Sequence, residues 1–147
     1  MERNDVIATL NDLIETSRDG EEGFRQCAET VKNPNLKPFF EQKAERCREA
    51  VTQLQQIVRE MGGNPETGSS TSGTMHRFWV SLRSSITGMN DHAILDECER
   101  GEDVAKQSYE KALAQDLPGD VKRVIERQFA EVKANHDKVR QMRNATA

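Results

Sequence analysis

The sequence predicts an all-α fold in which four long helices form a bundle of two hairpins. The main observation is an internal duplication, since residues 13–61 recur without a gap 81 positions later. One hairpin of this length can bury its apolar stripe only against another, so two copies should pack face to face. The composition, 31% charged and 5% aromatic, suits helices packed through aliphatic side chains. The identical pairs include Gly20/Gly101, Glu21/Glu102, Gln26/Gln107, Glu29/Glu110, Leu36/Leu117, Val51/Val132 and Met61/Met142.

The duplication divides the 147 residues into three parts of one expected domain, residues 1–147. The first hairpin covers 4–61, a crossover with a short helix covers 62–90, and the second hairpin covers 91–143. A chain of this length can build one ordinary hydrophobic core, so a single domain is the simplest organisation.

The first hairpin is predicted from two amphipathic stripes. We expect its first helix to begin at an Asn4 or Asp5 cap and to end at Asn33-Pro34. The second helix begins near Pro38, a favourable first-turn residue, and stops at Gly62-Gly63. Apolar residues recur at helical spacing along both: Ile7, Leu10, Ile14, Phe24, Ala28 and Val31, then Phe40, Ala44, Cys47, Val51, Leu54 and Val58.

A connection and a short extra helix follow. Residues 62–74 are rich in Gly, Ser, Thr, Asn and Pro, which predicts a non-helical crossover. At roughly 3.3 Å per residue, such a segment can cover the length of a helix, as packing of equivalent helices requires. Residues 75–87 then place apolar side chains at helical spacing, so we expect a short helix that carries Trp79 into the bundle. His76, at the start of that helix, is expected to make a capping or interhelical hydrogen bond.

The second hairpin repeats the pattern of the first. A break or cap at Gly88 and Asn90 opens its first helix, and residues 117–120 separate its two helices. The inward stripe of the last helix contains two polar residues, Gln128 and Asn135. We expect both side chains to face the interior of the bundle.

Two glutamates interrupt the apolar stripes at matching positions of the repeat. Glu21 and Glu102 both fall where the helical spacing predicts a core residue. An unpaired buried carboxylate costs several kcal/mol, so these side chains should join a structural polar layer, share a proton or bind a cation. Counting from each hairpin turn places Glu49, Gln128 and Glu131 at the same level. We favour the structural layer, while a metal site and solvent exposure stay open as alternatives.

The metal alternative can be compared with known di-metal bundles. In di-iron and di-manganese bundles, two helices supply one Glu each and the other two supply Glu-x-x-His. Glu21 and Glu102 meet the first requirement. No Glu-x-x-His occurs, because the residues three positions before the histidines are Gly73, Met89 and Lys133. We therefore expect no cofactor, and the alternative is iron, manganese or zinc held by Glu21 and Glu102 with Glu49, Gln128 and Glu131 as further ligands.

Composition and motifs exclude several classes of function. A net charge of -4 opposes a phosphate-binding surface, so nucleic acid is not an expected partner. No apolar run approaches the roughly 20 residues that span a bilayer, and the first residues lack the apolar core of a signal peptide. We therefore expect a cytoplasmic protein without membrane contact. Glycine-rich phosphate loops, nucleophile elbows and Cys-x-x-Cys are absent, so no catalytic residue is assigned and an enzyme is disfavoured. The odd set of Cys27, Cys47 and Cys98 is interpreted as reduced, partly buried thiols.

Further residues carry a family resemblance over nearly the whole chain, from about residue 4 to residue 142. They are Gly62 and Pro65, the linker from Gly68-Ser69 to Gly73, His76-Arg77 with Trp79, and Gly101-Glu102 ahead of Tyr109. With these residues the chain resembles a bacterial family of ferritin-like four-helix bundles known chiefly as a domain of unknown function. The resemblance implies an up-down-down-up bundle, a cytoplasmic bacterial protein and a link to stress physiology. It does not imply iron storage, since only Glu21 and Glu102 match the metal centre of ferritins.

These observations lead to two functional hypotheses. The first is a ferritin-like four-helix bundle without catalysis, acting as a structural or interaction protein in a stress response. The alternative is a di-metal carboxylate protein of non-standard ligands with a metal-handling or redox role. A homo-oligomer and a protein partner both stay open, with the surface around the Trp79 helix as the expected contact.

Overall fold

The structure of the protein, a computed structural model, describes residues 2–65 and 74–145. This part of the chain contains five α-helices and one 3-10 helix, and no β-strand. They are α1 (Arg3–Thr30), α2 (Leu36–Glu60), α3 (Thr74–Arg83), η1 (Ile86–Gly88), α4 (Asp91–Leu113) and α5 (Gly119–Ala145). The all-α prediction is confirmed for these residues. Residues 66–73 of the predicted crossover, with the linker glycines of the family resemblance, lie outside the described residues.

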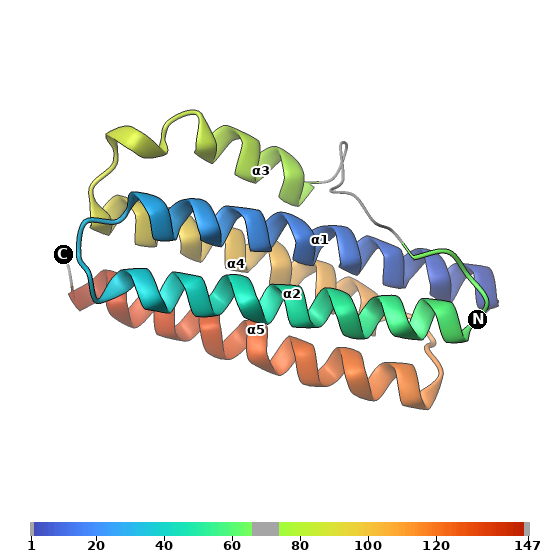
Figure 1. Cartoon of the computed structure of the whole chain (residues 1–147). Helices are drawn as coiled ribbons and strands as arrows, with labels where there is room; N and C mark the ends of the chain where they lie inside the picture. Colours follow the sequence, from blue (N-terminus) through green and yellow to red (C-terminus); the bar gives the residue numbers. More distant parts are fainter. Residues whose placement is uncertain (1, 66–73, 146–147) are drawn as a thin grey trace.

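The four long helices lie side by side, and α3 lies across one side of them (Figure 1). α1 and α2 form one antiparallel hairpin, and α4 and α5 form another. α3 and η1 lead toward the end of the molecule at which α4 begins, so that α4 runs opposite to α1 (Figure 1). Of the long helices, α1 packs against both α2 and α4. α3 contacts α1 and α4. The second hairpin therefore meets the first mainly through α1 and α4.

The hydrophobic core consists of two clusters at different levels along the helices. One contains Phe24, Ala28, Phe40, Trp79, Ile94, Leu95 and Val139. The other contains Leu10, Ile14, Val51, Leu54, Tyr109 and Ile125. Residues 15–23 of α1, 45–50 of α2, 99–108 of α4 and 126–138 of α5 add no buried apolar side chain to either cluster. The apolar stripe is therefore broken at the same level on all four long helices.

Two helix ends follow their local sequence signals. α4 begins as predicted, because the side-chain oxygen of Asn90 accepts the backbone N–H of Ala93 at 2.8 Å. At the end of α2, Gly62 has a φ of 80°, a left-handed backbone that glycine adopts without steric cost. The predicted stop at the glycine pair is confirmed.

The start of α1 differs from the prediction. α1 begins at Arg3, without a side-chain capping bond, so the expected Asn4 or Asp5 cap is wrong. That end of α1 is exposed, and water can satisfy its free N–H groups. α2 begins at Leu36, so Pro38 lies in its first turn, as predicted.

The start of α2 is organised by the other hairpin. Both carboxylate oxygens of Asp91 accept backbone N–H groups from the loop after α1, those of Lys32 and Asn33, at 2.9 Å each. The side chain of Asn33 in turn accepts the N–H of Asn35 at 2.9 Å. Because Asp91 opens α4, this contact joins the two hairpins at one end.

The extra helix is divided into α3 and η1. Trp79, Leu82 and Ile86 are buried, as their spacing predicts, and Val80 on the opposite side is 45% exposed. His76 makes the expected interhelical contact, with its Nδ1 3.4 Å from a carboxylate oxygen of Asp19.

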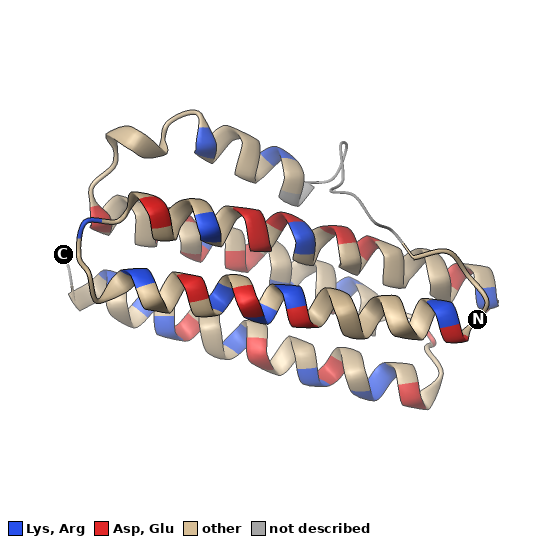
Figure 2. Ribbon diagram, viewed as in Figure 1, with Lys and Arg blue, Asp and Glu red and all other residues tan. Residues whose placement is uncertain are grey.

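Lys and Arg alternate with Asp and Glu along α2 and α5 (Figure 2). Within the described ranges, every helix is too short or too polar to cross a bilayer.

Candidate functional site

A cavity of about 60 Å³ occupies the level at which the apolar stripes are broken. On this measure one water needs about 10–15 Å³, so the space could hold roughly four to six water-sized groups. Its wall is mainly apolar and receives side chains from every α-helix of the described residues. Contributors include Ser17 and Phe24 of α1, Cys47 of α2, Trp79 of α3, Glu102 of α4 and Gln128 of α5.

Glu102 is the main ionisable group inside this cavity. It is 4% exposed, and its Oε1 has no hydrogen-bond partner among the described residues. Burial raises the pKa of this carboxyl to about 8, although the ammonium group of Lys43 acts in the opposite direction. Glu102 is therefore mostly protonated at neutral pH. A neutral carboxylic acid can both donate and accept a hydrogen bond.

The sequence of α4 places Glu102 on the inner face. Cys98, Glu102, Ala105 and Tyr109 follow one another at steps of three or four residues, so they lie on one stripe of the helix. Cys98 and Tyr109 belong to the two hydrophobic clusters on either side, which hold the stripe inward. The side chain of Glu102, between them, is therefore buried.

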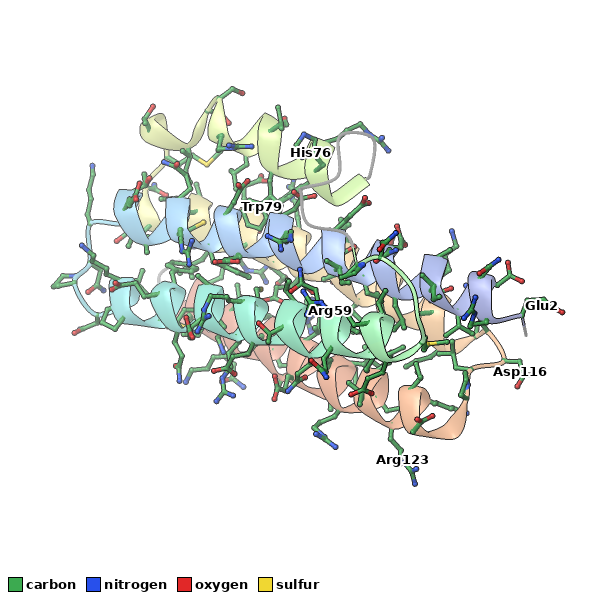
Figure 3. All side chains as sticks on the ribbon, turned by 45° about the vertical axis from the view of Figure 1, so that its right-hand side comes forward. Glu2, Arg59, His76, Trp79, Asp116 and Arg123 are labelled. Carbon is green, nitrogen blue, oxygen red and sulfur yellow. The ribbon has the colours of Figure 1, made fainter. Side chains whose placement is uncertain are left out.

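Trp79 lines the cavity and reaches it from α3, the helix that carries it (Figure 3). It fits between α1 and α4 because glycine occupies the facing positions. A Cβ added at Gly23 would lie 2.2 Å from the indole ring, and one at Gly101 would lie 3.1 Å from it. Trp79 packs edge-on against Phe24, with ring centroids 5.7 Å apart. Its buried indole N–H has no hydrogen-bond partner among the described residues.

A chain of hydrogen bonds connects α4, α5 and α2 at one wall of the cavity. The hydroxyl of Tyr109 donates to Oε1 of Gln128 at 2.8 Å, and the amide of Gln128 donates to Oε1 of Gln53 at 2.9 Å. Burial raises the pKa of Tyr109, so the phenol stays neutral and acts as a donor. The inward position predicted for Gln128 is confirmed, and its amide is fully used in this wall.

The cavity reaches the surface between α2 and α5. Arg46 and Glu131 both line it, and both are exposed. Next to them, the ammonium of Lys43 donates a hydrogen bond to the side-chain oxygen of Asn135 across the same two helices. Burial lowers the pKa of Lys43, while the nearby Glu102 opposes that shift. Charged and polar groups therefore surround the opening, and the apolar wall lies behind them.

The residues that the sequence placed at this level separate into two groups. Glu102, Gln128 and Glu131 line the cavity. Glu21 does not: its side chain is 14% exposed and its carboxylate lies 2.5 Å from the guanidinium of Arg25, one turn along α1. Glu49 is likewise exposed, and its carboxylate lies 3.6 Å from Arg46 on its own helix.

Glu21 lies beside the inner stripe of α1 because that stripe passes through glycine. The buried residues of this part of the helix include Ser17, Gly20 and Phe24, which follow one another at steps of three and four. A Cβ at Gly20 would lie 3.2 Å from the sulfur of Cys47, so glycine allows α1 and α2 to pack closely there. Duplicated positions therefore have different surroundings: Glu102 lies inside the core and its counterpart at the edge.

The donor groups around the cavity do not form a ready metal centre. Among the described residues, no three His, Cys, Asp or Glu side chains converge as metal ligands would. Within the described ranges, the cavity has no histidine in its wall.

Sequence reasoning missed the parts of the site that depend on other helices. The sequence did not predict that Gly23 and Gly101 leave space for the Trp79 ring. It also did not predict that Lys43 lies at the opening of the cavity. The signal available was the small residue at Gly101, which is duplicated at Gly20. A repeated glycine inside predicted helices indicates close packing, although it does not identify the partner.

The chain was compared with models of known protein families. The model of a family described as a domain of unknown function, DUF2383, matches residues 5–115, a range that runs from the first turn of α1 to just beyond the end of α4. That is 111 of the 147 residues, well over half of the chain. No curated protein matches the sequence.

Proposed function

We propose a function for this chain, which belongs to the DUF2383 family, from the chemistry of its central cavity. The protein is a non-catalytic interaction module in which the cavity binds a small, uncharged molecule with a polar head. The unpartnered and mostly neutral Glu102 inside an apolar wall carries this proposal. We further propose that the protein is a cytoplasmic bacterial one that takes part in a stress response.

The fold is proposed to be a ferritin-like four-helix bundle built from a duplicated hairpin. The 81-residue offset of the repeat aligns α4 with α1 and α5 with α2. The opposite directions of α1 and α4 agree with an up-down-down-up order. α3 and η1 then belong to the crossover that this order requires.

The absence of catalysis is proposed from the state of the nucleophilic groups in the cavity. Burial raises the pKa of both Cys47 and Tyr109, so both stay protonated at neutral pH. A thiol or phenol of this kind needs an adjacent base or a lowered pKa to react. The hydroxyl of Tyr109 is instead engaged with Gln128.

The wall chemistry favours a neutral ligand over an ion. Glu102 offers a donor and an acceptor, and the indole of Trp79 offers a second donor. The oxygen of a carbonyl or amide group can accept hydrogen bonds from both donors, the carboxylic acid of Glu102 and the indole N–H of Trp79. Burying an anion beside Glu102, or a second cation beside Lys43, costs several kcal/mol without a dedicated partner. The space of about 60 Å³ limits the buried part to a few heavy atoms.

Three probes of similar size test this proposal: isobutyramide, isobutyrate and isobutylammonium. Binding is measured by ligand-observed NMR at pH 6.5 on the full chain. We expect the amide to bind, and both ions to bind at least about tenfold more weakly. Ala50→Leu, which extends a larger side chain from the wall into the cavity, should abolish binding. Ala130→Leu, on the exposed side of α5, should not. Absence of amide binding, or preference for the ammonium, would contradict the proposal.

The second candidate function is a metal-handling or redox protein with non-standard carboxylate ligands. The specific observation in its favour is that Glu102 keeps a buried oxygen without a partner, with Gln128 and Glu131 in the same wall. Iron, manganese or zinc bound near stoichiometry after aerobic purification, and lost in Glu21→Gln/Glu102→Gln, would support it. Protein free of metal after incubation with each ion would reject it.

Self-association or a protein partner belongs to the first proposal. Trp79 is buried, so it is unavailable as the contact that its helix was expected to provide. Val80, 45% exposed on the outer side of α3, is the better candidate. Light scattering of Val80→Ser against the unchanged chain tests this: a fall in mass supports the contact, and equal monomeric masses exclude self-association through it.

A further inference from the structure

Two buried thiols from different hairpins are in contact. The sulfur of Cys27 on α1 lies 3.3 Å from that of Cys98 on α4, although the residues are 71 positions apart. Neither residue has exposed surface, and both belong to the cluster around Phe24 and Trp79. A disulfide has an S–S bond of about 2.05 Å, so the two sulfurs need to approach by only about 1.3 Å.

We propose that Cys27 and Cys98 are an oxidisable pair that forms a disulfide between the two hairpins, with a hydroperoxide as the oxidant. This inference is independent of any ligand in the central cavity. It assigns different roles to the three cysteines, because Cys47 lies in the cavity wall and is not part of the pair. The odd cysteine count of the sequence is then one pair and one single thiol.

The reaction is a two-electron oxidation of the pair. One thiolate attacks an oxygen of the peroxide, the O–O bond breaks, and a sulfenic acid and water are formed. The second thiol then attacks the sulfenic sulfur, and a second water leaves as the S–S bond forms. Overall, two thiols and one hydrogen peroxide give one disulfide and two waters. An organic hydroperoxide gives one alcohol in place of one water.

Burial determines the rates of these steps. Burial and the hydrogen bond with Cys27 raise the pKa of Cys98 well above its usual value, so little thiolate exists while the helices are packed. The first step therefore depends on local opening of α1 from α4 and is slow. The second step is fast, because closing of the two helices brings the two sulfurs back into contact. Once formed, the disulfide is shielded from soluble reductants by the same packing.

The disulfide should stabilise the protein by linking segments that are distant in sequence. Closing a loop of about 71 residues restricts the unfolded chain more than the folded one. For a domain of this size, the expected rise in Tm is on the order of 10 °C. α1 and α4 form the main contact between the hairpins, so the link falls at the place where it restrains them most.

The test uses the full chain with Cys47→Ser, which leaves two of the three cysteines. After removal of reductant and exposure to excess hydrogen peroxide, free thiols are counted in denaturant and the peptides are mapped by mass spectrometry. We expect both thiols to be lost, a linked peptide containing Cys27 and Cys98, a monomer on a non-reducing gel and a higher Tm. Dithiothreitol added after unfolding should restore both thiols.

Matched variants separate the pair from general thiol oxidation. Cys27→Ser/Cys47→Ser and Cys47→Ser/Cys98→Ser each keep one buried thiol, and neither should gain Tm on oxidation. Two free thiols left after treatment, sulfinic acid at either cysteine, intermolecular dimers or a lower Tm would each overturn the proposal. If Cys47→Ser fails to fold, peptide mapping of the unsubstituted chain gives the same decision through the Cys27–Cys98 peptide.

Discussion

Replacing Glu102 by glutamine should change the way in which the stability of the protein depends on pH. In the folded chain, burial raises the pKa of this carboxyl to about 8 from an ordinary value of 4.5. Between these two values the folded state holds a proton that the unfolded state has released. Stability therefore falls as the pH rises, because folding must take up that proton. Glutamine has nearly the same shape and does not titrate, so it removes this dependence.

The size of the effect follows from the two pKa values. The free energy of unfolding should fall by about 1.4 kcal/mol per pH unit in this window. From pH 5 to pH 8 the loss sums to roughly 3 kcal/mol. Below the pKa of the unfolded state, Glu102 is protonated in both states and causes no loss of stability. Above the pKa of the folded state, it is ionised in both states and the loss stops growing. Glu102 is 4% exposed, so solvent screening reduces the effect little.

Urea unfolding followed by circular dichroism at half-unit steps from pH 5 to pH 8 measures this effect. The quantity of interest is the difference in free energy of unfolding between Glu102→Gln and the unsubstituted chain, which should grow with pH in favour of glutamine. Glu110→Gln, an exposed carboxylate on the same helix, is the matched control and should follow the unsubstituted chain. A difference that stays constant over this range would refute the assignment of Glu102 as a neutral buried acid.

Three further substitutions test the packing around the site. Gly23→Ala places a methyl group in the space of the Trp79 ring, so thermal unfolding should show a loss of stability of roughly 2–3 kcal/mol. The control Gly119→Ala has open space around the added methyl group and should change stability by less than about 0.5 kcal/mol. Equal effects of the two substitutions would contradict the close fit of Trp79 against Gly23. Asn90→Ala removes the cap of α4 and should cost about 1 kcal/mol in urea unfolding, so an unchanged midpoint would argue against the cap. Tyr109→Phe removes a buried donor at 2.8 Å and should cost about 1 kcal/mol by the same measurement, and a gain in stability would show that the hydrogen bond is not formed.

Much of the fold could be predicted from local rules. The apolar spacing of three and four residues indicated the long helices, and the glycine pair at 62–63 and Asn90 marked their ends correctly. The polar break in the stripes is visible in the sequence itself, at Glu102 and Gln128. These features depend on neighbours within a few residues along the chain. The contact of Asp91 with the loop before α2 was not predicted, because it comes from the other hairpin.

The sequence by itself determined an all-helical chain with a polar level across its long helices. Only the tertiary structure decided that Glu102 lies in the core while Glu21 pairs with an arginine at its edge, and that two cysteines 71 positions apart touch. The repeat makes the two glutamates equivalent in sequence, but a single Trp79 and a single α3 make their surroundings unequal. Periodicity determines which side of one helix is apolar. The register and rotation of one helix against another depend on how all side chains fill the space between them, and this is a property of the packed molecule.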